Sequence, residues 1–325
     1  MVWMLVALSA CTNDPVGRVP EQADTGLPPG SIVDLTMEFD PPPPGGVQIL
    51  LGDVTIPPST ESFICLYGTW TDPDAAVTYV SPYQSKFGHH AQLKAVPAGY
   101  EQPDGTQRVC PGPDSMNLFT PFFEAVVAEE GIEVDPTNMM MLPEGVAVKL
   151  AQGQHWTFDT HWVNTSENYI NVNAALNLGF MDTAEVTDWA SSFQLDVGIL
   201  EIPAGEAISL PFDCGFPEDL TVISLLGHMH GYGTSYAVDH LREDGSVVRV
   251  YDIPVWEEDF RDQGVVQPFS PGELVVQSAE ALRTTCSWYN PTDHILEFPE
   301  EMCTTVGVGY PLEEPFACFR DVPQE

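Results

Sequence analysis

Basic residues are scarce in this sequence: 10 lysines and arginines stand against 48 aspartates and glutamates, which gives a formal net charge of −38 over 325 residues. A surface this negative repels phosphate backbones, so the composition excludes nucleic acid as a partner. The same charge attracts cations, metal ions among them. Because the acidic residues are spread along the chain, a solvated acidic surface is the simpler interpretation.

The sequence also lacks any Cys-x-x-Cys pair, which argues against a zinc ribbon or a thioredoxin-like site. Its first apolar run, "MVWMLVALSAC", is too short to span a bilayer. Small residues precede Cys11, and the run resembles the lipobox of bacterial lipoproteins, although it contains no basic residue. We therefore expect a lipid on Cys11 as the only membrane attachment and an extracytoplasmic location, in the periplasm or at the cell surface.

Short runs rich in valine, isoleucine, threonine and aromatic residues recur along the chain, separated by proline, glycine, aspartate and asparagine. This pattern predicts an all-β fold of two tandem antiparallel β-sandwiches of jelly-roll type. No helical crossovers separate the runs, which excludes a parallel α/β sheet. Strands are expected over residues 31–39, 46–52, 62–70, 75–80, 146–164, 169–180, 194–203, 220–230, 246–255, 273–278, 282–290 and 304–311. Only the segment 114–131 reads as a helix.

The chain is expected to divide into three parts. Residues 1–30 hold the signal, the lipobox and a linker rich in proline and glycine. Residues 31–187 form a first β domain and residues 188–325 a second, with the boundary in the stretch 181–194. An even number of cysteines in an exported chain indicates disulfides, but spacing does not choose the pairing. These six cysteines are Cys65, Cys110, Cys214, Cys286, Cys303 and Cys318.

Histidines occur in groups. In "LLGHMHGYG", strand alternation places His228 and His230 on one face and Met229 on the other. Taken alone, such a pair can be a metal site or a buried polar pair, and the adjacent His89 and His90 can be polar surface. Six positions separate His155 from His161, so an unbroken strand would put both on one face. His155 could then substitute as a ligand or form a hydrogen bond at the surface, and the surface role is favoured. The remaining two, at 240 and 294, are expected to be structural.

Together these groups resemble a known family. A histidine pair, a third histidine, His-x-His and a late Met-Cys, in this order, resemble the copper type II, ascorbate-dependent monooxygenases, the family of peptidylglycine α-hydroxylating monooxygenase and dopamine β-monooxygenase. His161 follows His90 by 71 positions, and Met302 follows His230 by 72. The resemblance covers roughly residues 30 to 325.

The resemblance implies two copper ions per chain and a hydroxylation of a small-molecule C–H bond by O₂, with ascorbate or another one-electron reductant. One copper, which stores electrons, would be bound by His89, His90 and His161. The second, which activates O₂, would be bound by the catalytic residues His228, His230 and Met302. Imidazole suits both copper oxidation states, and a thioether favours Cu(I). The implied disulfides are Cys65–Cys110, Cys214–Cys318 and Cys286–Cys303, the last of which would fix the backbone beside Met302.

Three positions depart from the family. Val306, Leu226 and Asp159 replace a tyrosine, an arginine and a glutamine of the best-known members, and these departures argue against a peptide substrate. They also leave a second hypothesis open, a non-catalytic copper-binding or surface-interaction lipoprotein with the same fold. The sequence specifies neither the substrate, the reductant nor the oligomeric state.

Overall fold

The computed structural model describes residues 28–110, 120–126, 142–261, 264–298 and 300–320. These residues form β-strands and two short 3₁₀ helices, η2 (Thr183–Glu185) and η3 (Glu258–Arg261), so the all-β prediction is confirmed. The chain divides into two compact units, and Asp188 begins the main segment of the second. The described part of the chain has no helix with the length and apolar character of a membrane span. Cys11 lies outside the described residues.

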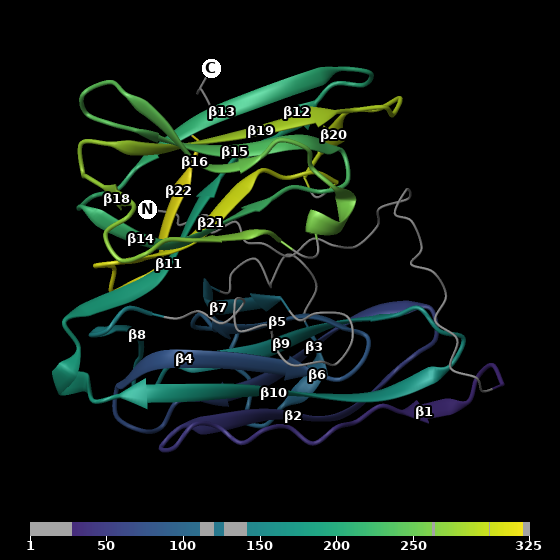
Figure 1. Cartoon of the computed structure of the whole chain (residues 1–325). Coiled ribbons are helices and arrows are strands. Elements are labelled where there is room, and N and C mark those ends of the chain that lie inside the picture. Colours follow the sequence, from purple (N-terminus) through teal and green to yellow (C-terminus); the bar gives the residue numbers. More distant parts are fainter. Residues whose placement is uncertain (1–27, 111–119, 127–141, 262–263, 299, 321–325) are drawn as a thin grey trace. The chain divides into compact units, whose positions relative to one another are not determined.

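Unit 1 contains two sheets (Figure 1). The first is built from β1 (Ile32–Asp34), β2 (Val47–Ile56), β4 (Ala75–Gln84), β8 (Val146–Leu150) and β10 (Tyr169–Met181). The second has the order β6 (Gln107–Val109), β3 (Thr60–Thr69), β9 (His155–Asn164), β5 (Gly88–Ala95) and β7 (Thr120–Val126). Strands of the two sheets contact each other, β4 with β5 and β2 with β9, as the layers of a sandwich do.

The helix predicted over 114–131 is wrong in its described part, because Thr120–Val126 is strand β7. It pairs antiparallel with β5, Leu93 opposite Phe123 and Lys94 opposite Pro121. Pro121 has no backbone N–H to give to a helix or a central ladder, but a strand at the end of a sheet tolerates it. Cross-strand pairing with β5 therefore determines the conformation of the described part of this segment.

Unit 2 is also built from two main sheets. One contains β11 (Asp188–Asp196), β14 (Leu220–His228), β17 (Val266–Pro268), β18 (Val275–Val276), β21 (Thr304–Tyr310) and β22 (Phe316–Phe319). The other has the order β13 (Ala207–Gly215), β19 (Ala281–Tyr289), β15 (Gly233–Leu241) and β16 (Val247–Ile253), which lie together in Figure 1. A short pair joins β12 (Glu201–Ile202) to β20 (Leu296–Glu297).

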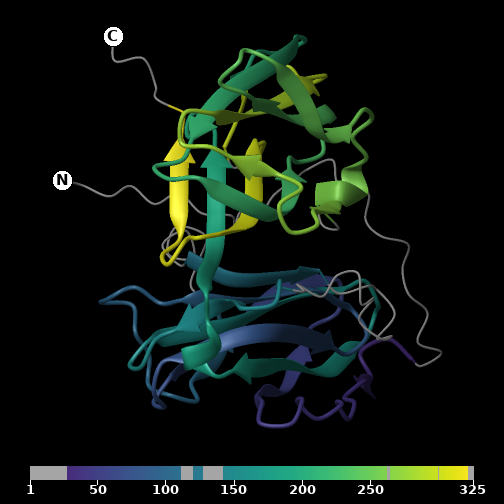
Figure 2. The same cartoon turned by 60° about the vertical axis from the view of Figure 1, so that its left-hand side comes forward.

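The core of unit 2 lies between these two sheets. Phe193 and Leu225 from the first sheet and Trp288 from the second belong to one cluster of buried apolar residues. Gly307 lets this packing close, because a Cβ at that position would come within 2.1 Å of the Phe193 ring. The strand β22 runs parallel to β11, with Phe193 opposite Phe316, and Figure 2 shows the yellow β22 alongside the teal β11.

Three disulfides link the described cysteines: Cys65–Cys110, Cys214–Cys318 and Cys286–Cys303. These are the pairings that the family resemblance implied. Cys65–Cys110 joins β3 to the end of β6 in unit 1, and Cys214–Cys318 joins β13 to β22 in unit 2. Cys286–Cys303 connects β19 to the residue that precedes β21 and follows Met302.

A row of alternating charges crosses the second sheet of unit 2. Asp213 lies opposite Arg283, Arg283 opposite Asp239, and Asp239 opposite Arg249. The Arg283 Nε donates to Asp213 at 2.6 Å, and the Arg249 Nε donates to Asp239 at the same distance. Each of these side chains is in contact with solvent, so the individual ion pairs are weak. We call these four residues the arginine row.

Candidate functional site

The residues His228, His230 and Met302 come together at one end of the first sheet of unit 2. β14 ends at His228, which lies opposite Thr304 of the antiparallel β21. Beyond the paired residues, the backbone N–H groups of His230 and Met302 both donate to one oxygen of Glu301, which keeps the two residues close together. The two imidazole rings have centroids 5.2 Å apart, so both side chains project from the same face. His230 and Met302 are buried, and His228 is half-buried.

Met229 does not take part in this cluster. It is fully buried and belongs to the apolar core between the two sheets of unit 2. A Cβ at Gly233 would come within 2.8 Å of the Met229 methyl carbon, which shows how closely the backbone packs against this side chain. The expected alternation of "HMH" is therefore confirmed, with two imidazoles on one face and the thioether of Met229 on the other.

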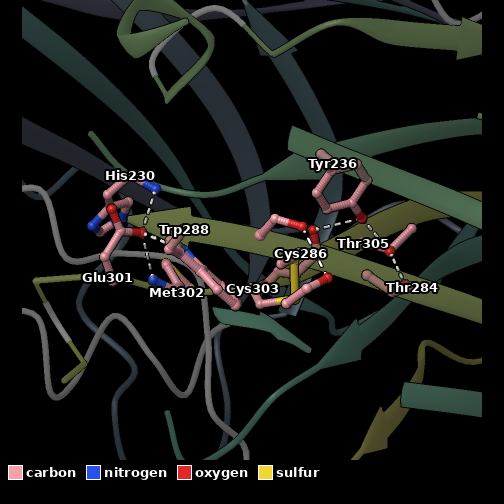
Figure 3. The surroundings of a disulfide bond; sticks show 12 residues. His230, Tyr236, Thr284, Cys286, Trp288, Glu301, Met302, Cys303 and Thr305 are labelled. Carbon is pink, nitrogen blue, oxygen red and sulfur yellow. Dashed lines mark hydrogen bonds between the residues drawn. A yellow bond between two sulfur atoms is a disulfide. The ribbon is translucent and has the colours of Figure 1, made fainter. Parts of the chain in front are cut away.

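Glu301 ties the two segments of the cluster together, as Figure 3 shows. Its Oε2 accepts hydrogen bonds from the backbone N–H of His230 at 2.9 Å, the backbone N–H of Met302 at 3.3 Å and the indole Nε1–H of Trp288 at 3.1 Å. Its Oε1 accepts from the Tyr232 N–H at 2.6 Å. The side chain is fully buried, and this desolvation raises the pKa of Glu301 to about 7, although the four donors favour the carboxylate.

The ring orientation of His230 follows from a second contact. The His230 Nδ1 lies 3.1 Å from the carbonyl oxygen of Glu300. A carbonyl oxygen can only accept, so Nδ1 carries the proton and donates to it. Nε2 is then the nitrogen with a lone pair, which is the form in which a histidine binds a metal ion while its other nitrogen is held by the backbone.

Asp196 lies on the same face of the sheet, in the same cross-strand row as His228. It is opposite Thr304 of β21, which is in turn opposite His228. Burial raises the pKa of the Asp196 carboxyl to about 6, and the Gln194 amide, which donates to Oδ2 at 2.9 Å, only partly offsets this effect. A buried carboxyl therefore stands two strands away from the imidazoles.

Asp196 gives the first testable prediction. The pKa of Asp196 in the folded state, about 6, lies above the ordinary value of 3.8, so the folded state binds the proton more tightly than the unfolded state does. The protonated carboxyl therefore adds to the free energy of unfolding at low pH, and this contribution is lost as the pH rises through 6. Replacing Asp196 by asparagine removes a buried charge, and we expect the unfolding free energy at pH 7.5 to rise by up to about 3 kcal/mol, with no gain near pH 4. Urea unfolding at both pH values measures this difference.

The matched control for that experiment is Asp293→Asn in the same unit, because the Asp293 side chain is fully exposed. It should change stability little at either pH. An Asp196→Asn variant that is less stable than the parent protein at pH 7.5 would show that the carboxylate makes a net favourable contribution there, contrary to the prediction.

In unit 1, the structure places only part of the other predicted ligand set. His90 lies opposite His161 in the pairing of β5 with β9, but the side chains of His89 and His90 lie outside the described residues. His161 is buried, its Nε2 lies 2.7 Å from the Glu61 carboxylate, and its ring stacks on Phe63 with centroids 4.0 Å apart. The prediction of a three-histidine site therefore stays a prediction.

The same face of β9 carries a buried ion pair that the sequence did not reveal. The Lys94 ammonium donates to Asp159 Oδ2 at 2.9 Å, and each side chain is only 4% exposed. Burial raises the pKa of Asp159, and the charge of Lys94 opposes that shift. His155, also on β9, contacts the Thr69 hydroxyl through Nδ1 at 3.0 Å, in keeping with a hydrogen-bonding role.

No protein-family model matches the chain, and no curated protein matches it. The solved structure of PNGase F, a glycosylasparaginase from Flavobacterium meningosepticum, is similar at a TM-score of 0.38 and 10% identity, covering 84% of this chain and 98% of that one. A recombinant N-glycanase F matches at a TM-score of 0.35 and 9% identity, covering 83% and 97%. The STIV MCP matches at 0.27 and 11% identity, covering 81% and 91%. At such scores none of these likenesses transfers an activity.

These findings correct the prediction of a copper- and ascorbate-dependent monooxygenase. Neither the family models nor the curated proteins support that family, and the structures named above are an N-glycanase and the STIV MCP. Within the described ranges, no three or more histidine, cysteine or carboxylate side chains gather as a metal site. The cluster in unit 2 has only two such side chains, and its third donor is a thioether. The oxygenase activity and the use of ascorbate are therefore not carried further.

Proposed function

We propose that unit 2 binds a soft monovalent metal ion, copper as Cu(I), through His228, His230 and Met302. The observation that carries this proposal is the shared contact of His230 and Met302, whose backbone N–H groups both donate to Glu301 Oε2, while the two imidazoles lie side by side. Two donors from the end of β14 and a third, 72 positions later in the sequence, thus belong to one cluster. A bound Cu(I) ion would supply a soft, redox-active centre.

The types of donor fit Cu(I) better than other common metals. Imidazole and thioether are soft or borderline ligands, whereas Mg²⁺ and Ca²⁺ prefer oxygen and structural Zn²⁺ sites use four cysteine or histidine ligands. His230 has Nδ1 held by the Glu300 carbonyl, so Nε2 is ready to coordinate without a change of tautomer. The net charge of −38 also attracts cations to the chain.

Titration with Cu(I) under anaerobic conditions, in competition with a chromogenic chelator, tests the proposal. We expect His228→Ala and Met302→Leu each to weaken binding by more than the roughly 10- to 100-fold that changes outside the coordination sphere cause. Met229→Leu is the matched control, because it changes the neighbouring core methionine to a residue of similar volume. The proposal is wrong if Met302→Leu binds Cu(I) as tightly as the parent protein.

Copper stoichiometry addresses the remaining predicted site in unit 1. The same titration should show that His228→Ala removes one bound ion. Any second ion would have to be lost separately in a His161→Ala variant, as the predicted set His89, His90 and His161 requires.

The proposal includes an extracytoplasmic location for the protein. Three disulfides in one chain are typical of oxidising compartments and rare in the reducing cytosol. Lipid attachment at Cys11 remains a prediction from the sequence, which mass spectrometry of the protein purified from membranes would test.

A further inference from the structure

We propose that Glu301 is the positioning residue of the metal site: its carboxylate fixes the backbone of His230 relative to that of Met302 before a metal ion binds. This inference rests on the proposed Cu(I) site. Neither the sequence pattern nor the similarity to solved structures assigns any role to Glu301. The ligands of the proposed site are His228, His230 and Met302, and Glu301 acts on the last two through their backbone N–H groups.

The hydrogen bonds of Glu301 reach both segments that carry ligands. One oxygen, Oε2, accepts from the N–H of His230 and from the N–H of Met302, so a single atom joins the two backbones. The other oxygen accepts from Tyr232 and holds the turn that follows His230. Trp288 of β19 donates to the same carboxylate and attaches it to the second sheet (Figure 3).

Only a carboxylate can accept all four of these bonds. An amide in its place offers one oxygen and an NH₂ group, so one side of the group would present donors to backbone N–H donors. A buried N–H left without an acceptor has a large desolvation cost, and the local backbone would move to avoid it. The identity of residue 301 therefore determines whether His230 and Met302 keep their relative position.

Further contacts hold the backbones of His230 and Met302 in place. Cys303 follows Met302 and is bound to Cys286, two residues before Trp288 on β19. The Trp256 indole donates to the His230 carbonyl oxygen at 3.0 Å, which holds the other side of that residue. Because the ligand backbones are fixed from several directions, metal binding would cost little ordering of the chain.

Two substitutions of Glu301 test whether the acceptor oxygens and the length of its side chain position the ligands. Glu301→Gln keeps the length of the side chain but loses the second acceptor oxygen. Glu301→Asp keeps the carboxylate but shortens its reach to the four donors. We expect each to weaken Cu(I) binding by about 10- to 100-fold and to remove the sulfur contribution from the X-ray absorption spectrum of the Cu(I)-loaded protein.

Glu297→Gln, at an exposed position of β20, is the matched control and should leave both measurements unchanged. Circular dichroism and thiol titration of the metal-free variants establish that the fold and the disulfides are intact, and Glu301→Asp provides the comparison if Glu301→Gln does not fold. If the parent protein binds no Cu(I), the proposed function itself fails. If the parent binds Cu(I) with sulfur coordination and both variants bind within threefold of it, the positioning role is overturned. If Glu301→Asp binds as tightly as the parent protein, the reach of the carboxylate to the four donors does not position the ligands, and the proposal is also overturned.

Discussion

Replacing Lys94 by methionine should destabilise unit 1 by about 3–5 kcal/mol, the range seen when one partner of a buried ion pair is removed. Lys94 is the hydrogen-bonded cation at the buried Asp159 carboxylate, and the substitution leaves that charge without compensation in a site only 4% exposed. Urea unfolding at pH 7.5 measures the loss. The penalty should shrink as the pH falls, because the pKa of Asp159 is already raised by burial and the stranded carboxyl can take up a proton.

Two further variants make the result specific. The double variant Lys94→Met with Asp159→Leu should recover most of the lost stability, since an apolar pair of similar volume can replace a buried ion pair. Lys149→Met is the matched surface control, because Lys149 is more exposed and lies 3.9 Å from Asp74, and it should cost at most about 1 kcal/mol. Equal losses in Lys94→Met and Lys149→Met would contradict the prediction.

Removal of the Cys214–Cys318 disulfide should have an effect of similar size in unit 2. The bond closes a loop with a sequence separation of 104, for which chain entropy predicts a stabilisation of about 5 kcal/mol. It also holds β22, whose Phe316 packs against Phe216 with ring centroids 5.2 Å apart. We expect the Cys214→Ser, Cys318→Ser double variant to unfold at a much lower urea concentration.

Limited proteolysis distinguishes a local from a general loss in that variant. If the disulfide holds β22 on β11, a protease should release the C-terminal peptide from the double variant before it cuts elsewhere in unit 2. Unchanged unfolding together with an uncut C-terminus would show that the strand pairing alone is sufficient.

The sequence predicted the fold class because strand alternation is a local property. "LTVISLLGHMH" became β14 and its extension, and Met229 lies in the core on the side that alternation requires. The strand β5 was not predicted, because "GHHAQLKA" carries a histidine pair and a lysine where a buried strand is expected to be apolar. Lys94 is buried there only because Asp159, 65 positions later, lies beside it.

In the candidate site, too, some residues could be predicted from the sequence and one could not. His228, His230 and Met302 could be selected from the sequence because their residue types suggest metal chemistry. Glu301 could not, because one acidic residue in "EFPEEMC" looks like the next in a chain with 48 of them. Its burial and its four donors follow from tertiary contacts with Trp288 and the turn after His230, and no local pattern encodes them. The family resemblance, drawn from ordered residue types, predicted an activity that the comparisons do not support.

The arginine row links the stability of unit 2 to the ionic strength of its surroundings. Arg283 and Arg249 are two of only 10 basic residues, and they neutralise aspartates on one sheet while most acidic groups elsewhere have no cation to pair with. Dissolved salt weakens these exposed pairs, but it also screens the mutual repulsion of 38 uncompensated negative charges. A net charge this far from zero opposes the compact state, so we expect counter-ions from the medium to stabilise the folded chain and low salt to destabilise it.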